Sequence, residues 1–385
     1  MKNQLSILLL FFFNCSFIYG QIFIKTDIPC NKELLKKTPG QWLPTSEDKY
    51  NAAKLTVQER KEIMNRVFKI HQRIKEIYPS PTAVDANLFW GASDNMYASE
   101  LKMNRKSNGV LDWYNDKGIP VITYNSGAGF CAYDCGINPN EIMRGKGCET
   151  ATFIEIQINR IDEIFISQRL DDDFAEIMRI DNRQIKIMAP IVGKWKGYDV
   201  YNSHGIYNPN EKIVFLFHRE GVLPYIPVTR KQYLERCILG LPLFFDKTIK
   251  AFDHPEGLAS LMDNKERLEQ IKKTQKIRDD VLKYYQDELA ATTKAGKLDE
   301  PAVVSEGIAS ILISHPVFTT TEKKGRMLVT ENPAYIRKDL PKYIPQIIVY
   351  YLNNCSGCYA DPSLNPYKLL DEKFPIEKLQ AMIDK

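Results

Sequence analysis

The sequence lacks the short motifs that mark several large classes of enzyme. Its 385 residues contain no His-Glu-x-x-His, no Gly-x-Ser-x-Gly, no P-loop and no Gly-x-Gly-x-x-Gly after a strand pattern. Zinc proteases of that motif, α/β-hydrolases, P-loop nucleotidases and Rossmann dehydrogenases are therefore not indicated. A hydrolase built from carboxylates or histidine stays open, because paired carboxylates meet only in the folded chain.

Histidine and net charge are also scarce. The chain has five histidines, and most of them lie next to proline or glycine. We therefore expect no histidine-built metal centre, and no motif indicates a cofactor. Lys and Arg total 52 against 48 Asp and Glu, so the net charge of +4 gives no electrostatic reason to expect nucleic-acid binding.

Long apolar runs are missing after the N-terminus. The most apolar later stretches, residues 237–245 and 344–352, are interrupted by polar residues, proline or glycine. Neither could span a bilayer, which takes about 20 apolar residues, so no transmembrane segment is expected in the mature chain. With 44% hydrophobic and 26% charged residues, the composition is that of a soluble globular protein.

Residues 1–20, in contrast, have the pattern of an export signal. Lys2 provides the positive start, residues 7–13 are all apolar, and Gly20 is a small residue suited to cleavage. We predict that the mature chain starts after Gly20 and lies in the periplasm or outside the cell, with attachment to the cell surface as a variant. Acylation at Cys15 is the lipoprotein alternative, but bulky residues precede that cysteine.

Seven cysteines remain after such cleavage, and in an oxidising compartment clustered cysteines usually form disulfides. Because seven is odd, at least one is unpaired. We assign that place to Cys237, which helical spacing puts on an apolar face, where a free thiol behaves as a small hydrophobe. The disulfide candidates, whose pairing the sequence leaves open, are Cys30, Cys131, Cys135, Cys148, Cys355 and Cys358.

Two groups of cysteines have an alternative interpretation. Cys131, Cys135 and Cys148 have the spacing of three zinc ligands, but no fourth ligand is evident, so we favour disulfides and expect no metal. Cys355-Ser-Gly-Cys358 has the spacing of a thiol-disulfide exchange site. Two prolines soon after it argue against the helix that would acidify the first thiol, so we favour a structural bridge.

Helical periodicity is clearest over residues 56–78. The apolar positions recur at steps of three and four and comprise Met64, Val67, His71, Ile74 and Tyr78. Because His71 lies on this stripe, we favour a core histidine with a hydrogen-bond partner over a catalytic one.

Further helices are predicted in the second half of the chain. One begins at Thr229, whose spacing to Gln232 is that of a capping box. A long helix over residues 258–289 is rich in charge and has a narrow apolar stripe, so it projects or pairs with one other helix and offers a surface to a protein partner. Shorter helices are expected at residues 301–314 and 376–384.

Short segments rich in β-branched and aromatic residues dominate the middle of the chain. The predicted strands are residues 119–124, 152–158, 184–189, 198–201 and 212–218, followed by a buried strand at 344–352. Turn sequences between them predict an α+β fold, with a mainly antiparallel sheet, flanking helices and one long charged helix.

The expected domain organisation follows from these elements. Residues 36–50 are polar and contain two prolines, so residues 21–55 are predicted as a polar N-terminal arm. Residues 56–385 form the α+β body, with 56–245 and 246–385 as candidate subdomains.

The candidate binding residues are His218, Arg219 and Arg230. A strand ends at His218, and the proline-rich connection leads to a helix start at which two guanidinium groups and backbone N–H groups could meet an anion. The structural alternative has Arg219 in an ion pair and Thr229 as a simple helix cap, and we weigh it above binding. No catalytic residue is assigned.

A resemblance appears in the same region. The run Arg219-Glu-Gly-Val-Leu-Pro-Tyr-Ile-Pro-Val-Thr-Arg-Lys-Gln-Tyr-Leu234, together with Tyr78-Pro79, Asn332-Pro-Ala-Tyr and Pro345-Gln-Ile-Ile-Val, resembles uncharacterised exported proteins of Bacteroidota. The likeness spans most of the mature chain in order. It implies export and no particular activity.

Together these patterns favour a non-enzymatic binding or structural protein of the periplasm or cell surface. The first alternative is a secreted hydrolase with a carboxylate or histidine site. The second is a thiol-disulfide protein that uses Cys355 and Cys358.

Overall fold

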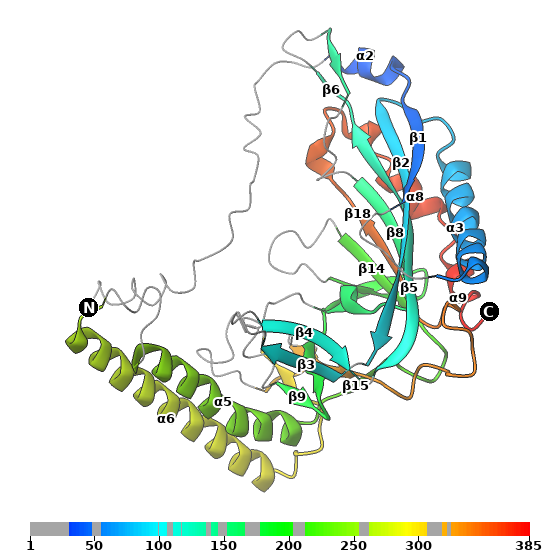
Figure 1. The fold of residues 1–385 in the computed structure, drawn as a ribbon. Coiled ribbons are helices and arrows are strands. Elements are labelled where there is room, and N and C mark those ends of the chain that lie inside the picture. The colour runs from blue at the N-terminus through cyan, green and yellow to red at the C-terminus, as the bar shows by residue number, and fades with distance from the viewer. Residues whose placement is uncertain are drawn as a thin grey trace.

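The computed structural model describes residues 31–47, 55–98, 100–105, 111–116, 118–135, 140–144, 152–165, 178–202, 212–253, 262–305, 318–321 and 325–385. The predicted leader, Cys30 and Cys148 lie outside these ranges. Within them the chain forms a large curved sheet with helices on one side and a long helical hairpin on the other (Figure 1).

The main sheet has eight strands among the described residues. In spatial order they are β1 (Gln41–Glu47), β2 (Val84–Tyr97), β5 (Ile119–Ala132), β8 (Thr152–Ile158), β18 (Ile348–Asn353), β14 (Lys212–Phe217), β13 (Tyr198–Tyr201) and β12 (Ile191–Trp195). Every neighbouring pair is antiparallel except β1 with β2. The predicted α+β class with a mainly antiparallel sheet is therefore confirmed.

One face of this sheet packs on α3 (Val57–Ile77), α8 (Tyr367–Lys373) and α9 (Glu377–Gln380). α3 begins at a capping box, in which Thr56 Oγ1 accepts a hydrogen bond from Glu59 N and the Glu59 carboxylate accepts one from Thr56 N at 2.8 Å. Its apolar stripe includes Val67 and Ile74, which are fully buried against the strands. The helix predicted over residues 56–78 is confirmed.

His71 is a core residue of α3, as the sequence indicated. Its Nε2 lies 3.0 Å from the backbone oxygen of Phe89 on β2, and only 3% of the residue is exposed. Burial lowers the pKa of His71, outweighing the hydrogen bond to Phe89 that favours the charged form. A neutral imidazole that joins α3 to the sheet accounts for its position.

The other face of the main sheet is partly covered by a smaller sheet. β17 (Arg326–Glu331) lies between β11 (Lys186–Ile187) and β15 (Tyr225–Pro227), and β16 (Val303–Val304) also pairs with it. A second hydrophobic cluster fills the space between the sheets, with Val214, Val329 and Tyr335 fully buried.

An ion cluster lies at the edge of this second core. The Lys186 Nζ lies 2.9 Å from Asp162 Oδ1 and 3.0 Å from Glu331 Oε1, and the lysine side chain is 21% exposed. Burial alone would lower the pKa of Lys186, but the two carboxylates outweigh burial and raise it. Asp162 belongs to η1 (Asp162–Ile164), Lys186 to β11 and Glu331 to β17. The three charges therefore join η1 to two strands of the small sheet.

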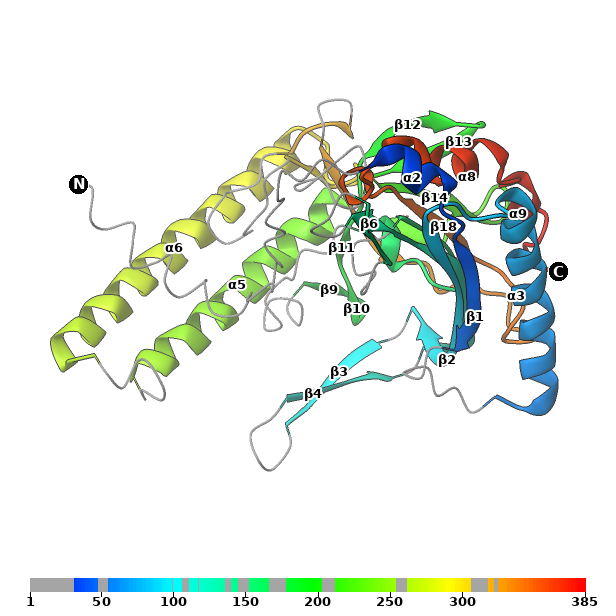
Figure 2. The ribbon, with the colours of Figure 1, turned by 90° about the horizontal axis from the view of Figure 1, so that it is seen from above.

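The long helices form an antiparallel hairpin, α5 (Arg230–Asp253) with α6 (Asn264–Lys294), which extends away from the sheet in both views (Figures 1 and 2). Tyr233 and Cys237 of α5 and Tyr285 of α6 are buried between the helices. The predicted long charged helix is confirmed, and it pairs with one other helix as expected. The predicted cap at Thr229 is also confirmed, since Thr229 N donates to Gln232 Oε1 at 2.9 Å.

The remaining elements are short. They are α2 (Lys32–Lys37), the hairpin of β3 (Glu100–Arg105) and β4 (Leu111–Asp116), the pair β6 (Asp134–Cys135) and β7 (Ile142–Met143), the pair β9 (Arg179–Ile180) and β10 (Arg183–Gln184), η4 (Ser356–Cys358) and η5 (Pro362–Leu364). None of the helices in the described ranges has the length and apolar character needed to cross a membrane.

Four local expectations need correction. Residues 21–55 were expected to form a polar arm. The described part of this segment instead forms α2, whose Leu35 is fully buried, and the edge strand β1. Residues 303–304 of the expected helix at 301–314 form β16, because β17 offers them a strand partner, and residues 306–314 lie outside the described ranges. The C-terminal helix is only the four-residue α9, because turns follow it. The subdomain boundary at 245/246 falls inside the continuous helix α5.

Candidate functional site

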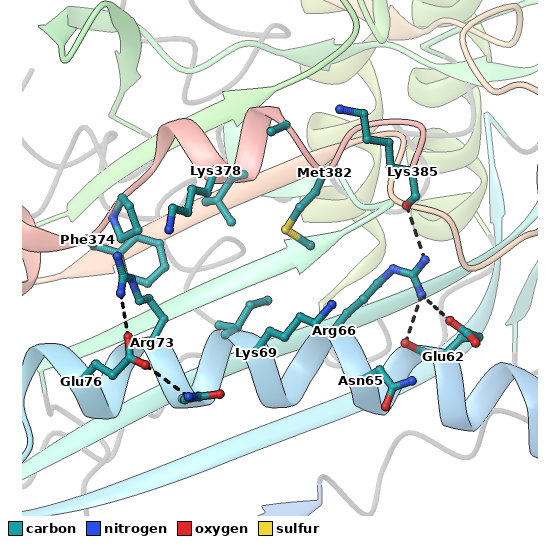
Figure 3. A pocket seen from close by; sticks show the side chains of 15 residues that line it. Glu62, Asn65, Arg66, Lys69, Arg73, Glu76, Phe374, Lys378, Met382 and Lys385 are labelled. Atoms are coloured by element: carbon teal, nitrogen blue, oxygen red, sulfur yellow. Dashed lines mark hydrogen bonds and ion pairs between the residues drawn. The ribbon is translucent and has the colours of Figure 1, made fainter.

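A groove of about 610 Å³ runs between α3 and the C-terminal segment, residues 374–385. One wall is the face of α3 from Glu62 to Glu76, and the other is the chain around α9 (Figure 3). Those fourteen residue steps of helix span roughly 21 Å at about 1.5 Å per residue, so the groove is long enough for about six residues of an extended peptide.

The floor of the groove is apolar. Ile70, Phe374 and Leu379 are buried in the main hydrophobic core, and their outer edges line the groove together with the half-buried Met382. The walls arise because α3 turns its apolar stripe to the sheet, which leaves its polar face directed at the C-terminal segment. The groove therefore combines an apolar base with polar sides.

The walls are strongly cationic. The lining carries five cationic side chains against the two carboxylates of Glu62 and Glu76, which leaves a formal charge of +3. The five are Arg66, Lys69, Arg73, Lys378 and Lys385.

The two arginines of the groove are held by their neighbours. Arg66 Nη1 lies 3.4 Å from Glu62 Oε2, and its Nη2 donates to the backbone oxygen of Lys385 across the groove at 3.4 Å. Arg73 Nη1 lies 2.6 Å from Glu76 Oε2. These ion pairs hold the two arginine side chains in place and occupy the carboxylates of Glu62 and Glu76.

The three lysines are different. Lys69, Lys378 and Lys385 are exposed and make no ion pair or side-chain hydrogen bond with any residue in the described part of the chain. Lys69 lies on the α3 wall and Lys378 on the opposite one (Figure 3). An anion in the groove would therefore meet lysines from both sides. Sequence reasoning missed this site; the recurrence of Arg66, Lys69 and Arg73 on one helix face was its only local signal.

Arg219, one of the predicted binding residues, is engaged by a carboxylate. Its guanidinium donates to both oxygens of Asp384, at 2.8 and 3.1 Å, and to the backbone oxygen of Tyr335 at 3.2 Å. The neighbouring His218 has its Nδ1 3.0 Å from the backbone oxygen of Val222.

Arg230 makes contacts elsewhere. Its Nη2 lies 2.9 Å from Glu300 Oε2, and its guanidinium lies over the Phe318 ring at 4.8 Å from the centroid. Arg219 and Arg230 share none of these partners, so the structure does not bring the three predicted residues together in one site. Their contacts fit the structural interpretation that the sequence favoured.

Two of the predicted residues nevertheless support the groove. His218 O accepts a hydrogen bond from Gln380 Nε2 at 2.9 Å, and Arg219 holds Asp384 as described above. Both partners belong to the C-terminal segment that forms one wall. This part of the chain thus positions Lys378 and Lys385 without contacting the space between them.

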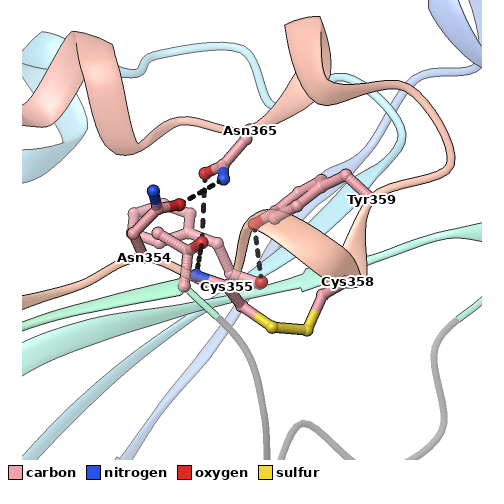
Figure 4. The surroundings of a disulfide bond; sticks show 7 residues. Asn354, Cys355, Cys358, Tyr359 and Asn365 are labelled. Carbon is pink, nitrogen blue, oxygen red and sulfur yellow. Dashed lines mark hydrogen bonds between the residues drawn. A yellow bond between two sulfur atoms is a disulfide. The ribbon is translucent and has the colours of Figure 1, made fainter. Parts of the chain in front are cut away.

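The Cys355–Cys358 disulfide is present, with Cα atoms 5.3 Å apart (Figure 4). It closes η4 directly after β18, and Cys355 N donates to Thr152 Oγ1 at 3.1 Å. The next element is the three-residue η5, so no α-helix begins at the first sulfur to lower its thiol pKa. A thiol-exchange function for this pair stays a prediction.

The other described cysteines also match their expected states. Cys131 and Cys135 are disulfide-bonded, whereas Cys237 is free and buried. Burial raises the pKa of the Cys237 thiol to about 12, which suits an inert core residue. In the described ranges no three His, Cys, Asp or Glu side chains gather in a way that could hold a metal ion.

Comparison with known proteins gives no relative. No protein-family model, no curated protein and no solved structure matches the chain. The resemblance to exported Bacteroidota proteins therefore stays a prediction.

Proposed function

We propose that the protein is an exported, non-enzymatic binding protein of the periplasm or cell surface, and that it holds an acidic peptide segment in the groove beside α3. The observation that carries this proposal is the pair of lysines Lys69 and Lys378, which lie on opposite walls above an apolar floor without carboxylate partners in the described chain (Figure 3).

The chemistry of the groove favours a peptide over a bare anion. Exposed ion pairs are worth at most about 1 kcal/mol each, so the two lysines alone would hold a small anion weakly. The apolar floor adds the burial of hydrophobic side chains, at about 25 cal/mol per Å². A segment in which acidic and apolar residues alternate uses both, because its successive side chains point in opposite directions.

The chemistry of the cysteines supports export. The Cys355–Cys358 bond, and the bonded state of Cys131 and Cys135, are what an oxidising compartment allows and a reducing cytosol disfavours. The leader pattern of residues 1–20 points to the same compartment.

Charge reversal in the groove is expected to weaken binding of an acidic probe at least tenfold. The probe is a fluorescein-labelled hexapeptide of alternating Glu and Leu, followed by fluorescence anisotropy. The double variant Lys69→Glu/Lys378→Glu changes the formal charge of the lining from +3 to −1, so it should repel the probe. Binding to the unchanged protein should weaken with added salt.

A matched variant controls for net charge. Lys273→Glu/Lys276→Glu makes the same change on the exposed surface of α6, and its affinity should stay within about twofold of the unchanged protein, because charges beyond about 10 Å are largely screened at 0.1 M salt. An equal loss in both variants, or no binding to the unchanged protein, would contradict the proposal. Inorganic phosphate that competes as well as unlabelled peptide would show that the apolar floor contributes nothing.

The predicted protein contact through residues 258–289 stays part of the proposal. Within this range α6 exposes Leu268 at 57%, and the paired helix α5 exposes Leu239 and Leu243, one turn apart, at 63% each. Apolar side chains that project from a surface are available to a protein partner.

If these leucines serve a partner and not the fold, Leu239→Ser/Leu243→Ser is expected to change the free energy of unfolding by less than about 0.5 kcal/mol. Urea denaturation measures this. The control is Leu241→Ser on the same helix, which is fully buried and should cost several kcal/mol. A loss above about 1 kcal/mol in the double variant would show that the leucines pack in the folded protein.

A further inference from the structure

One titratable side chain of the core lies behind the groove without taking part in it. His71 belongs to α3, and only 3% of it is exposed, because it lies on the side of the helix that faces the sheet. Lys69 and Arg73 of the same helix line the groove on the opposite side. A polar ring buried this deeply needs a hydrogen-bond partner.

The sheet supplies a partner for one ring nitrogen. Nε2 of His71 lies 3.0 Å from the backbone oxygen of Phe89 on β2. Because a carbonyl oxygen only accepts, Nε2 must carry the proton. The pairing of β1 with β2 is irregular at this height, since its register shifts between Leu43, opposite Asn87, and Ser46, opposite Phe89. The imidazole therefore donates to the strand where the neighbouring ladder is interrupted.

The other ring nitrogen has no partner. Nδ1 of His71 is shielded from solvent and makes no hydrogen bond in the described part of the chain. In a neutral ring whose Nε2 carries the proton, Nδ1 has only a lone pair. In a protonated ring Nδ1 becomes a second N–H donor, and neither an acceptor nor water lies against it. Protonation in place would thus bury a positive charge and an unmatched donor together, which is costly.

The charges on the helices do not offset that cost. Burial lowers the pKa of His71, and the positive charge of Lys75, one turn further along α3, lowers it too. Lys378 of α9 lies across the groove, on the other side of α3. On α8 the charge of Asp371 acts on Tyr350 of the sheet. The described helices therefore place no counter-charge beside the ring.

The sheet does not restore the ordinary pKa either. Asp85 of β2 alternates with buried apolar residues that face α3, so it lies on the other face of the strand. Asp94 lies near the far end of β2 and is exposed. Glu47 of β1 pairs in register with Trp90, and β5 carries no charged residue. With all these groups in place, the pKa of His71 stays below its ordinary value.

We propose that His71 is an acid-sensitive latch between α3 and the sheet. The neutral imidazole fastens the helix to β2 through the Phe89 carbonyl, and protonation of the ring weakens this attachment. Because the face of α3 from Glu62 to Glu76 forms one wall of the groove, the latch lies behind the proposed binding site. The latch does not depend on that proposed function, and its test needs no peptide.

The sign of the pH effect follows from the direction of the shift. The unfolded chain takes up a proton near the ordinary pKa of 6.5, whereas the folded protein resists it. The contribution of His71 to stability is therefore fully present above that value and is lost as pH falls through it toward the lowered folded pKa. Glu59 and Asp162, whose pKa values are also lowered, have ordinary values of 4.5 and 3.8, so their effects come at lower pH.

Urea denaturation of the full chain at about pH 7.5 and about pH 5.5 tests the latch. One group of this kind can raise the unfolding equilibrium constant by at most about tenfold over that interval. In His71→Gln the amide nitrogen takes the place of Nε2 and keeps a donor for Phe89, but it does not protonate. The constant of the unchanged protein is expected to rise at least about threefold more than that of the variant. Equal changes in the two proteins would overturn the proposal.

A second variant covers the case in which His71→Gln does not fold, as judged by circular dichroism. His71→Leu has a similar size and no titratable group, so it is expected to be less stable at both pH values but to lose the extra sensitivity to acid. A pH dependence as large as that of the unchanged protein would again contradict the latch.

Hydrogen exchange followed by mass spectrometry locates the effect. After correction for the intrinsic exchange rate, the protection of α3 is expected to fall at least about threefold from pH 7.5 to pH 5.5 in the unchanged protein and to stay constant in His71→Gln. The internal control is α6 (Asn264–Lys294), which contains no histidine and should keep its protection. An equal fall in both helices would show that acid acts on the whole protein and would overturn the latch.

Discussion

Lys186→Met is expected to lower the free energy of unfolding by about 3 kcal/mol, because it leaves the partly buried Glu331 without its cation, while Asp162 keeps only Arg160. Glu331 is 18% exposed and its second oxygen accepts a hydrogen bond from Ala98 N, so it cannot turn to solvent without losing that bond. Removal of one partner from a buried ion cluster typically costs about 3–5 kcal/mol, and partial exposure puts this case at the lower end. Chemical denaturation at pH 7 measures the change.

The same substitution at an exposed ion pair is the control. Lys194 lies 2.9 Å from Asp199, but its side chain is 70% exposed, so Lys194→Met should cost less than about 1 kcal/mol. Similar losses in the two variants would show that burial of Lys186 does not matter.

Acid should remove the difference between Lys186→Met and the unchanged protein. Lys186 and, to a smaller extent, Arg160 lower the pKa of Asp162 to about 2, below its ordinary value of 3.8, so Lys186→Met removes the larger part of this shift. A carboxyl whose pKa is lowered by folding stabilises the protein fully above the unfolded value, and that contribution is lost as pH falls through the folded value. The Asp162 part of the difference should therefore be constant above about pH 4 and shrink between pH 4 and 2.

Arg219→Met is expected to cost about 2–3 kcal/mol of stability and to weaken the acidic probe of the groove. The substitution leaves Asp384 without its bidentate partner, and Asp384 is 19% exposed. Hydrogen bonds to charged groups contribute about 1.5–3 kcal/mol. Because Asp384 belongs to the wall that carries Lys378 and Lys385, its release should loosen the groove. Denaturation and anisotropy measure the two effects.

Arg73→Met is the comparison for stability. Arg73 pairs with Glu76 within one helix, and its side chain is 42% exposed, so its removal should cost less than about 1 kcal/mol. If Arg219→Met kept full stability while anion binding was lost, Arg219 would be a binding residue after all, and the structural interpretation would be wrong.

Local patterns were sufficient for the elements with strong periodicity. The stripe of α3 and the cap at Thr229 involve residues within four positions of each other, so the sequence displays them directly. The apolar run of β18 and its antiparallel neighbours also followed from composition and turns. Strand β2 was not predicted, although apolar and polar residues alternate from Val84 to Leu88.

The strands that the sequence did not predict depend on partners that are distant in the sequence. β1 contains Pro44 and has no clean alternation, and it becomes a strand because β2 offers an open edge with which it pairs in parallel. The two-residue strands β11 and β16 are defined by pairing with β17 and carry no pattern of their own. No local reading of the sequence could supply these pairings.

The sites show the same limit. The periodicity of α3 placed His71 in the core, but its partner, the backbone oxygen of Phe89, lies on a strand 18 positions away. Arg219 lies next to a helix start in sequence, and its actual partner, Asp384, is 165 positions away. The sequence therefore favoured an ion pair for Arg219 over a ligand, but it could not name the carboxylate.

The two walls of the groove come from distant parts of the sequence. The hydrogen bond from Arg66 to Lys385 joins residues 319 positions apart. Because the groove exists only when both segments pack beside each other, the unfolded chain cannot hold a guest there. An occupied groove would therefore stabilise the folded protein against urea by mass action.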